Sequence, residues 1–147
     1  MTPTEQQINR FLVEVFNDVL HLEEASLADG PCKNLSVTEL HVLEAVQQCS
    51  GDEPSMSTLA ARLRITASTL TVAVKTLEKK GYLVRARCQD DKRRVTVHLT
   101  EQANAALAHH ATFHEKLIEG VSGHLTEQQM QDLVRALNSL HTFFTGL

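Results

Sequence analysis

The amino-acid sequence predicts a mainly α-helical fold with one small β-hairpin, and three observations support this prediction. Apolar residues recur every three to four positions over most of the chain, which is the spacing of amphipathic helices. Around residues 83–99 the pattern changes, and Val95, Val97 and Leu99 alternate with polar residues as strands do. The chain has 147 residues, of which 42% are hydrophobic, so it is long enough for one domain with one core.

The N-terminal part of the chain predicts two helices. Residues 4–28 carry apolar side chains at helical spacing, and the turn signal at residues 29–31 ends this helix. Ser36 and Glu39 have the spacing of a capping box, in which each side chain accepts a hydrogen bond from the backbone N–H of the other residue. A second helix is therefore expected to begin directly after Ser36.

The rest of the chain predicts two further helices, the hairpin and two last helices. In chain order these elements are a short helix at residues 56–63, a helix at 67–80 after a three-residue connection, two strands flanking the polar tip at 89–92, a long helix from Thr100 to about residue 121, and a final helix at about 126–144. Gly81 follows the helix at 67–80 as a C-terminal cap should. The predicted order is α-α-α-α-β-β-α-α.

This order is that of a winged helix-turn-helix, in which the second helix of the motif enters the major groove of DNA and the hairpin reaches beside it. Residues 62–94 hold ten of the 14 Lys and Arg and three of the 18 acidic residues, so the window is strongly basic inside an acidic chain. The residues expected to contact DNA are Ser68, Thr69, Thr71 and Lys75 on the helix and Asp91, Lys92, Arg93 and Arg94 at the hairpin tip. We expect Asp91 to hold Arg93 by a charge-assisted hydrogen bond.

Residues 56–100, which contain LAARL, TLTVAVKTLEKKGYL and DDKRRVTVHLT, resemble the MarR family of bacterial regulators. The resemblance implies a single domain over residues 1–147, with dimerisation helices at about 1–35 and 101–147 around a DNA-binding region at about 36–100. It also implies a homodimer that binds a pseudo-palindromic operator in double-stranded DNA. Large apolar residues in both terminal helices, among them Phe11 and Phe143, support a dimer independently, although an intramolecular core would also bury them.

Several classes of protein are not expected from this sequence. No apolar stretch is long enough to span a membrane and no leader precedes the first helix, so we expect a cytoplasmic protein. The three cysteines, Cys32, Cys49 and Cys88, do not suit a disulfide framework. No HExxH or similar motif of a metallohydrolase is present, so we do not expect an enzyme.

Eight histidines are the unusual feature of the composition. His110 and His114 stand four residues apart on the predicted long helix, so their imidazoles share one face and are close enough to share a metal. Glu24 and His41 lie on the first two predicted helices, which are expected to pack near this pair. Histidines and carboxylates are ligands that zinc accepts, although such a histidine pair also occurs by chance on solvated helices.

The histidine pattern resembles the zinc-responsive, AdcR- and ZitR-like branch of the MarR family. The resemblance implies a primary zinc site made of Glu24, His41, His110 and His114. It also implies a second site, for which Cys32, Glu39 and His109 are the candidates. In this reading Zn²⁺ is the effector and acts as the corepressor of a transcriptional repressor of zinc-uptake genes.

Other signals remain open for the same DNA-binding fold. Cys49 or Cys88 could sense an oxidant, and Cys88 lies among cations that favour a thiolate. The dimer crevice could instead bind a small aromatic ligand, with the metal playing a structural part.

Overall fold

The computed structural model describes residues 1–49 and 54–147 and confirms the predicted order of elements. The helices and strands are α1 (Pro3–Asp29), α2 (Val37–Gln48), α3 (Met56–Leu63), α4 (Ala67–Lys79), β1 (Leu83–Arg87), β2 (Val95–Leu99), α5 (Glu101–His124) and α6 (Glu127–Thr145). The chain forms two compact units, Met1–Ala111 and Thr112–Leu147, and the boundary between them lies inside the continuous helix α5.

Capping residues set where several helices begin. Ser36 is the N-cap of α2, and its capping box with Glu39 is formed as predicted. Thr66 caps α4, because its hydroxyl accepts a hydrogen bond from the backbone N–H of Thr69. The chain leaves α4 through Gly81, whose φ of +87° is a left-handed conformation that glycine adopts without strain.

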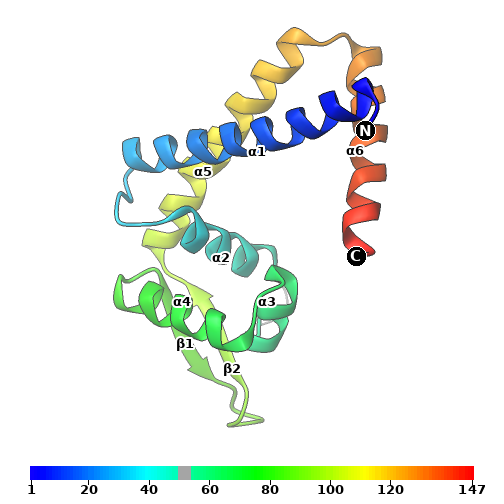
Figure 1. Cartoon of the computed structure of the whole chain (residues 1–147). Coiled ribbons are helices and arrows are strands. Elements are labelled where there is room, and N and C mark those ends of the chain that lie inside the picture. The colour runs from blue at the N-terminus through cyan, green and yellow to red at the C-terminus, as the bar shows by residue number, and fades with distance from the viewer. Residues whose placement is uncertain (50–53) are drawn as a thin grey trace. The chain divides into compact units, whose positions relative to one another are not determined.

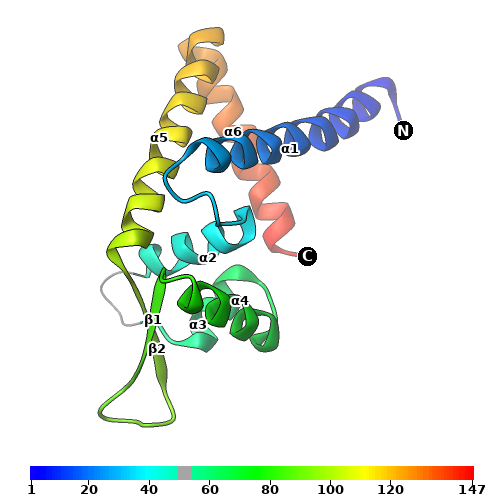
Figure 2. The same cartoon turned by 90° about the vertical axis from the view of Figure 1, so that its left-hand side faces the viewer.

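The core of the first unit lies among α2, α3, α4 and the base of the hairpin. Leu40 and Leu43 of α2, Leu59 of α3 and Leu70 of α4 have no solvent exposure. Figure 1 shows these helices gathered around the hairpin, and Figure 2 shows the tip of the hairpin extending away from them. The helix-turn-helix α3–α4 is therefore held by a packed core, and its outer face is left to solvent.

Strands β1 and β2 form an antiparallel pair, with Leu83 opposite Leu99 and Arg87 opposite Val95. Leu83 and Val97 near the base of the hairpin are buried while Arg87 nearer the tip is exposed, so the base of the hairpin joins the core. The hairpin is thus a wing anchored at its base, with the polar residues 88–94 at its free end.

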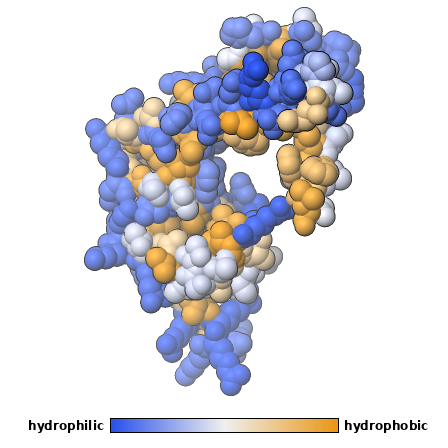
Figure 3. All heavy atoms as spheres, viewed as in Figure 1, coloured by the Kyte–Doolittle hydropathy of each residue, from blue (hydrophilic) through white to orange (hydrophobic). Residues whose placement is uncertain are grey.

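Helix α6 buries none of its residues within a single chain. Val134, Leu137, Phe143 and Phe144 are exposed on it, and Figure 3 shows apolar side chains along this helix. Phe11 and Phe16 are likewise exposed on α1. Such apolar surfaces mark interaction sites, which agrees with the expected homodimer. None of the described helices is long and apolar enough to cross a membrane.

Candidate functional site

The exposed face of α4 carries most of the residues expected to contact DNA. Ser68, Thr69 and Lys75 are exposed, opposite the buried Leu70. Thr71 differs, because it is partly buried and its hydroxyl donates a 2.8 Å hydrogen bond to the carbonyl oxygen of Ala67. The hydroxyl of Thr71 is therefore committed inside the helix and is a poorer candidate for a base contact than its neighbours.

The tip of the hairpin is organised by Asp91. Its carboxylate accepts a 3.0 Å hydrogen bond from the backbone N–H of Arg93, and its carbonyl oxygen accepts one from the backbone N–H of Arg94. The hydrogen bond that we expected from Asp91 to Arg93 is thus made by the backbone of Arg93. Asp91 fixes the turn of the backbone, and the exposed side chains of Lys92, Arg93 and Arg94 project from that turn.

Some cations of the basic window make contacts within the protein. Lys80 donates to both carboxylate oxygens of Glu39, at 2.8 and 3.0 Å, and Arg85 pairs with Glu78 at 2.9 Å. These contacts hold the end of α4 to α2 and to β1. Such cations stabilise the motif, whereas Lys75, Lys92 and Arg93 are exposed and remain the candidates for phosphate contacts.

A helix-turn-helix with a basic, exposed recognition helix, followed by a basic wing, defines a winged-helix DNA-binding regulator. A model of the MarR family matches residues 33–94 of this chain. The transcriptional regulator SarZ of Staphylococcus aureus strain MRSA252 is 30% identical over 106 residues, which cover 72% of this chain and 69% of SarZ. The chain belongs to the MarR family, and it is a DNA-binding transcriptional regulator and not an enzyme.

Two solved structures extend the likeness to nearly the whole chain. FabT of Streptococcus pneumoniae in complex with DNA has a TM-score of 0.91 and 29% identity, covering 97% of this chain and 98% of that one. AbsC of Streptomyces coelicolor, a MarR family regulator, has a TM-score of 0.79 and 24% identity, covering 100% of this chain and 98% of its own. The winged-helix fold predicted from the sequence is thereby confirmed.

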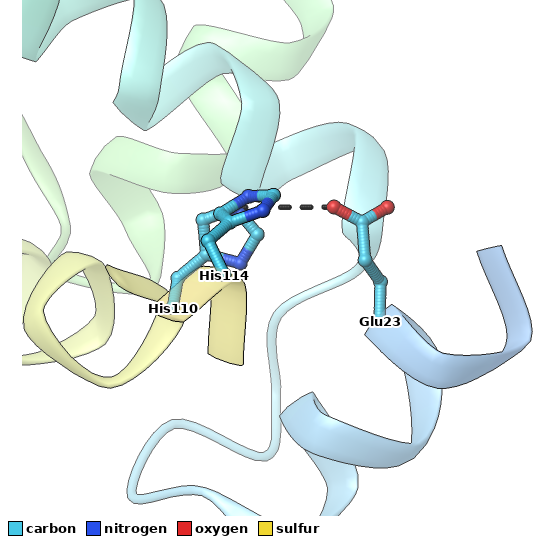
Figure 4. A group of neighbouring side chains, drawn as sticks. All are labelled: Glu23, His110 and His114. Atoms are coloured by element: carbon cyan, nitrogen blue, oxygen red, sulfur yellow. Dashed lines mark ion pairs between the residues drawn. The ribbon is translucent and has the colours of Figure 1, made fainter. Parts of the chain in front are cut away.

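A second group of candidate side chains lies away from α4. Atoms of Glu23, His110 and His114 that could bind a metal all lie within 4.8 Å of one another. Figure 4 shows the carboxylate of Glu23 on α1 directed at the two imidazoles of α5. Glu23 and His110 are buried, and His114 is exposed one helical turn further along α5. Among the described residues this is the one group with the composition and spacing of a metal site.

Helix α2 contributes two more side chains to this cluster. His41 Nε2 lies 3.4 Å from Glu23 Oε1, and His110 Nε2 lies 3.0 Å from Glu44 Oε1 and 3.8 Å from Glu23 Oε1. His110 is therefore placed between two carboxylates from different helices. A buried carboxylate such as Glu23 needs compensating partners, and the imidazoles of His41 and His110 are near enough to provide them.

The carboxylate in the cluster is that of Glu23, whereas the sequence suggested Glu24. Glu24 is exposed and lies 3.6 Å from His21 on the same helix. Neighbouring residues of a helix point about 100° apart, so α1 can present one of these two glutamates to α5 while the other faces solvent. The sequence holds a signal for the choice, because Glu23 shares its helix face with the buried Leu27, four residues later. The sequence also gave no reason to single out Glu44, whose carboxylate lies beside His110.

The three residues proposed for a second metal site are not brought together. The thiol of Cys32 is buried and lies 3.8 Å from the carbonyl oxygen of Gln102, and Glu39 is engaged by Ser36 and Lys80. The ring of His109 lies 2.9 Å from the carbonyl oxygen of Ser26. Each of the three side chains is thus occupied in joining different elements.

Gly30 and Tyr82 show how closely the loop after α1 is packed. A Cβ atom on Gly30 would lie 2.7 Å from a ring carbon of His109, so any other residue there would require this imidazole to move. The hydroxyl of the fully buried Tyr82 donates a hydrogen bond to the side-chain oxygen of Asn34. Burial and then the neighbouring Cys32 raise the pKa of Tyr82 to about 12. Loop, wing base and α5 therefore pack as one structure.

Proposed function

We propose that this protein is a transcriptional repressor whose affinity for DNA rises when a transition metal, in the first place Zn²⁺, binds Glu23, His110 and His114. The observation that carries the proposal is that two imidazole nitrogens and one carboxylate oxygen lie within 4.8 Å of one another, although they come from two helices far apart in the sequence. Two imidazoles and a carboxylate form a ligand set that zinc takes in proteins. His41 and Glu44 stand beside the set as candidates for a fourth ligand or for partners that orient the imidazoles.

The chemistry of His110 bears on how a metal would bind. Its Nε2 lies 3.0 Å from Glu44 Oε1, which is hydrogen-bond distance when this nitrogen carries a proton. A metal bound to the same nitrogen would require the neutral tautomer with its proton on Nδ1, so the hydrogen bond to Glu44 would be lost. We therefore expect metal binding to change the contact between α5 and α2.

The positions of the ligands give the proposal its mechanism. Glu23 lies before the DNA-reading motif in the chain and His110 lies after it, so a shared ion ties together the two segments that lead into and out of the motif. In a homodimer, restricting these segments restricts where the two recognition helices stand. An ion that favours the DNA-binding arrangement raises affinity by linkage, typically by about 5- to 150-fold. Zinc-uptake genes are the targets that this response would serve.

The experiment measures DNA affinity with and without zinc. DNA selected by the protein from a randomised duplex library serves as the probe, and its dissociation constant is measured by fluorescence anisotropy at fixed salt. We expect zinc to tighten binding by at least about fivefold in the wild type and not in His114→Ala. His114 is exposed, so this variant spares the core, and Glu24→Ala is the matched control that should keep the response. Equal affinity with zinc and with chelator would refute the proposal.

A second candidate is an organic effector in place of the metal. A shallow pocket of about 500 Å³, open to solvent, lies beside the cluster, and its lining residues are His41, Glu44, Ala45, Gln48, Arg62 and Leu63. This volume suits a small ligand, and Arg62 with His41 suits an acidic one such as an aromatic carboxylate. This candidate is favoured if the affinity of the protein for the library-selected DNA changes with small carboxylates and not with zinc. Alkylation of the thiols tests the remaining alternative, in which Cys49 or Cys88 senses an oxidant.

A further inference from the structure

Helix α4 has two sharply different faces. Leu70, Val74 and Leu77 form the inner face and have no solvent exposure. Val72 lies two residues from Leu70, which is about 200° around the helix, and so occupies the middle of the outer face. Its neighbours on that face are Ser68 and Thr69, about one turn earlier, and Lys75, nearly one turn later, and all three are exposed.

Val72 is an apolar residue that neither packing nor helix formation explains. Its side chain is 66% exposed, whereas Val74 on the same helix is fully buried. A β-branched residue also lowers helix propensity slightly compared with the polar residues that usually cover a solvated face. An exposed valine at the centre of a recognition helix therefore suggests a contact outside the chain.

The threonine hydroxyl groups beside Val72 are engaged within the protein, and that of Thr69 lies 2.8 Å from the hydroxyl of Thr66. Thr71 donates to the carbonyl oxygen of Ala67 at 2.8 Å, and Thr76 donates to the carbonyl oxygen of Val72 at 3.0 Å. The centre of the outer face thus presents methyl groups, with the hydroxyl of Ser68 on one side and the cation of Lys75 on the other. The side chains that could form hydrogen bonds with bases therefore surround Val72, and Val72 itself offers only methyl groups.

In the major groove, thymine displays one group that an aliphatic side chain recognises, the methyl group at its C5 atom. We propose that Val72 determines sequence specificity by contacting the 5-methyl group of a thymine in each operator half-site, while Lys75 holds the adjacent phosphate. The contact removes both methyl surfaces from water, and cytosine, which lacks this methyl group, is disfavoured at the same position. This proposal rests on the DNA-binding role of α4 and not on the metal.

The test removes the methyl group from the DNA. The full-length protein first selects duplexes from a randomised library at one fixed zinc concentration, and each thymine of the selected half-site is then replaced by deoxyuridine, which keeps every hydrogen-bonding group. We expect one thymine at which the replacement weakens wild-type binding by about fourfold per half-site, the factor that corresponds to burying one methyl-sized group.

Variants of Val72 assign the effect to its side chain. Val72→Ala should bind thymine and deoxyuridine equally at that position, and Val72→Thr, which keeps one methyl group, should retain part of the difference. Ser68→Ala is the matched control on the same face and should keep the full thymine-to-deoxyuridine ratio, whatever its overall affinity. Because Val72 is exposed and alanine has the higher helix propensity, the melting temperature of Val72→Ala should be no lower than that of the wild type. The proposal is overturned if no thymine is sensitive, or if Val72→Ala retains the sensitivity.

Discussion

The DNA-reading surface and the Glu/His cluster are built in opposite ways. The DNA-reading surface takes its residues from two short segments, 68–75 and 91–94, and nearly all of them are exposed. The cluster takes Glu23, His41, Glu44 and His110 from three helices, and its central members are buried. A surface that meets DNA needs charge and reach, whereas a site that could hold an ion needs atoms fixed to within an ångström.

This difference predicts how each region responds to substitution. On the exposed surface, each cation attracts phosphate groups across solvent that contains salt. Losing one cation should therefore weaken DNA binding by a limited, salt-dependent factor. In the cluster, the outcome should depend on which of two adjacent glutamates is changed. Substitutions at the hairpin tip, at Glu23 and at Tyr82 test this contrast, in order of decreasing expected effect.

The largest effect is expected at the hairpin tip. Replacing both Arg93 and Arg94 by alanine should weaken DNA binding about 100-fold and lower the slope of log Kd against log salt by about 2 for each protomer, because two phosphate contacts are lost. Fluorescence anisotropy over a salt series measures both quantities. Arg135→Ala on α6 removes a cation outside the motif and serves as the control. An unchanged salt slope would show that the tip does not touch phosphate groups.

A smaller but sharper effect is expected from two neighbouring residues of α1. Glu23→Gln should weaken zinc binding about tenfold or more, because the carboxylate beside His110 loses its charge. Glu24→Gln is the same chemical change at the adjacent residue. It should leave zinc affinity within about twofold of the wild type, since Glu24 faces solvent. Competition with a chromophoric zinc chelator measures both affinities. Equal losses in the two variants would contradict the assignment of the ligand to Glu23.

The smallest effect concerns Tyr82, which joins the wing base to the loop after α1. Tyr82→Phe removes the hydrogen bond to Asn34 and should lower the free energy of unfolding by about 1 kcal/mol at neutral pH. The raised pKa of Tyr82 means that the folded state holds the phenolic proton more tightly than the unfolded state does. This stabilisation is complete below pH 10.0 and is lost as the pH rises towards about 12.

Urea unfolding of wild type and Tyr82→Phe over this alkaline range tests the sign. The wild type should lose stability more steeply than the variant, so the two curves should converge. If the two stability curves diverge instead, the folded state favours the ionised phenolate of Tyr82. The same variant sharpens the comparison of the two regions, because an altered zinc response in Tyr82→Phe would show that they communicate through this contact.

The sequence by itself determined the order of the elements and the exposed cations of α4 and the hairpin tip, because both depend on local patterns. The capping box at Ser36 and Glu39, the turn at Gly81 and the alternation in β2 specify their elements from residues a few positions apart. The recognition helix and the hairpin tip are also short segments, so their exposed cations could be named without knowing how distant parts of the chain pack.

The tertiary structure alone decided which side chains meet in the cluster. Glu23 and not Glu24 faces His110, Glu44 joins from α2, and Cys32, Glu39 and His109 go to separate partners. The i, i+4 pair of His110 and His114 was visible in the sequence because one helix carries both. The rotation of α1 about its own axis was not visible in the sequence. A rotation of about 100° exchanges the positions of adjacent residues, and only packing against α2 and α5 fixes this rotation.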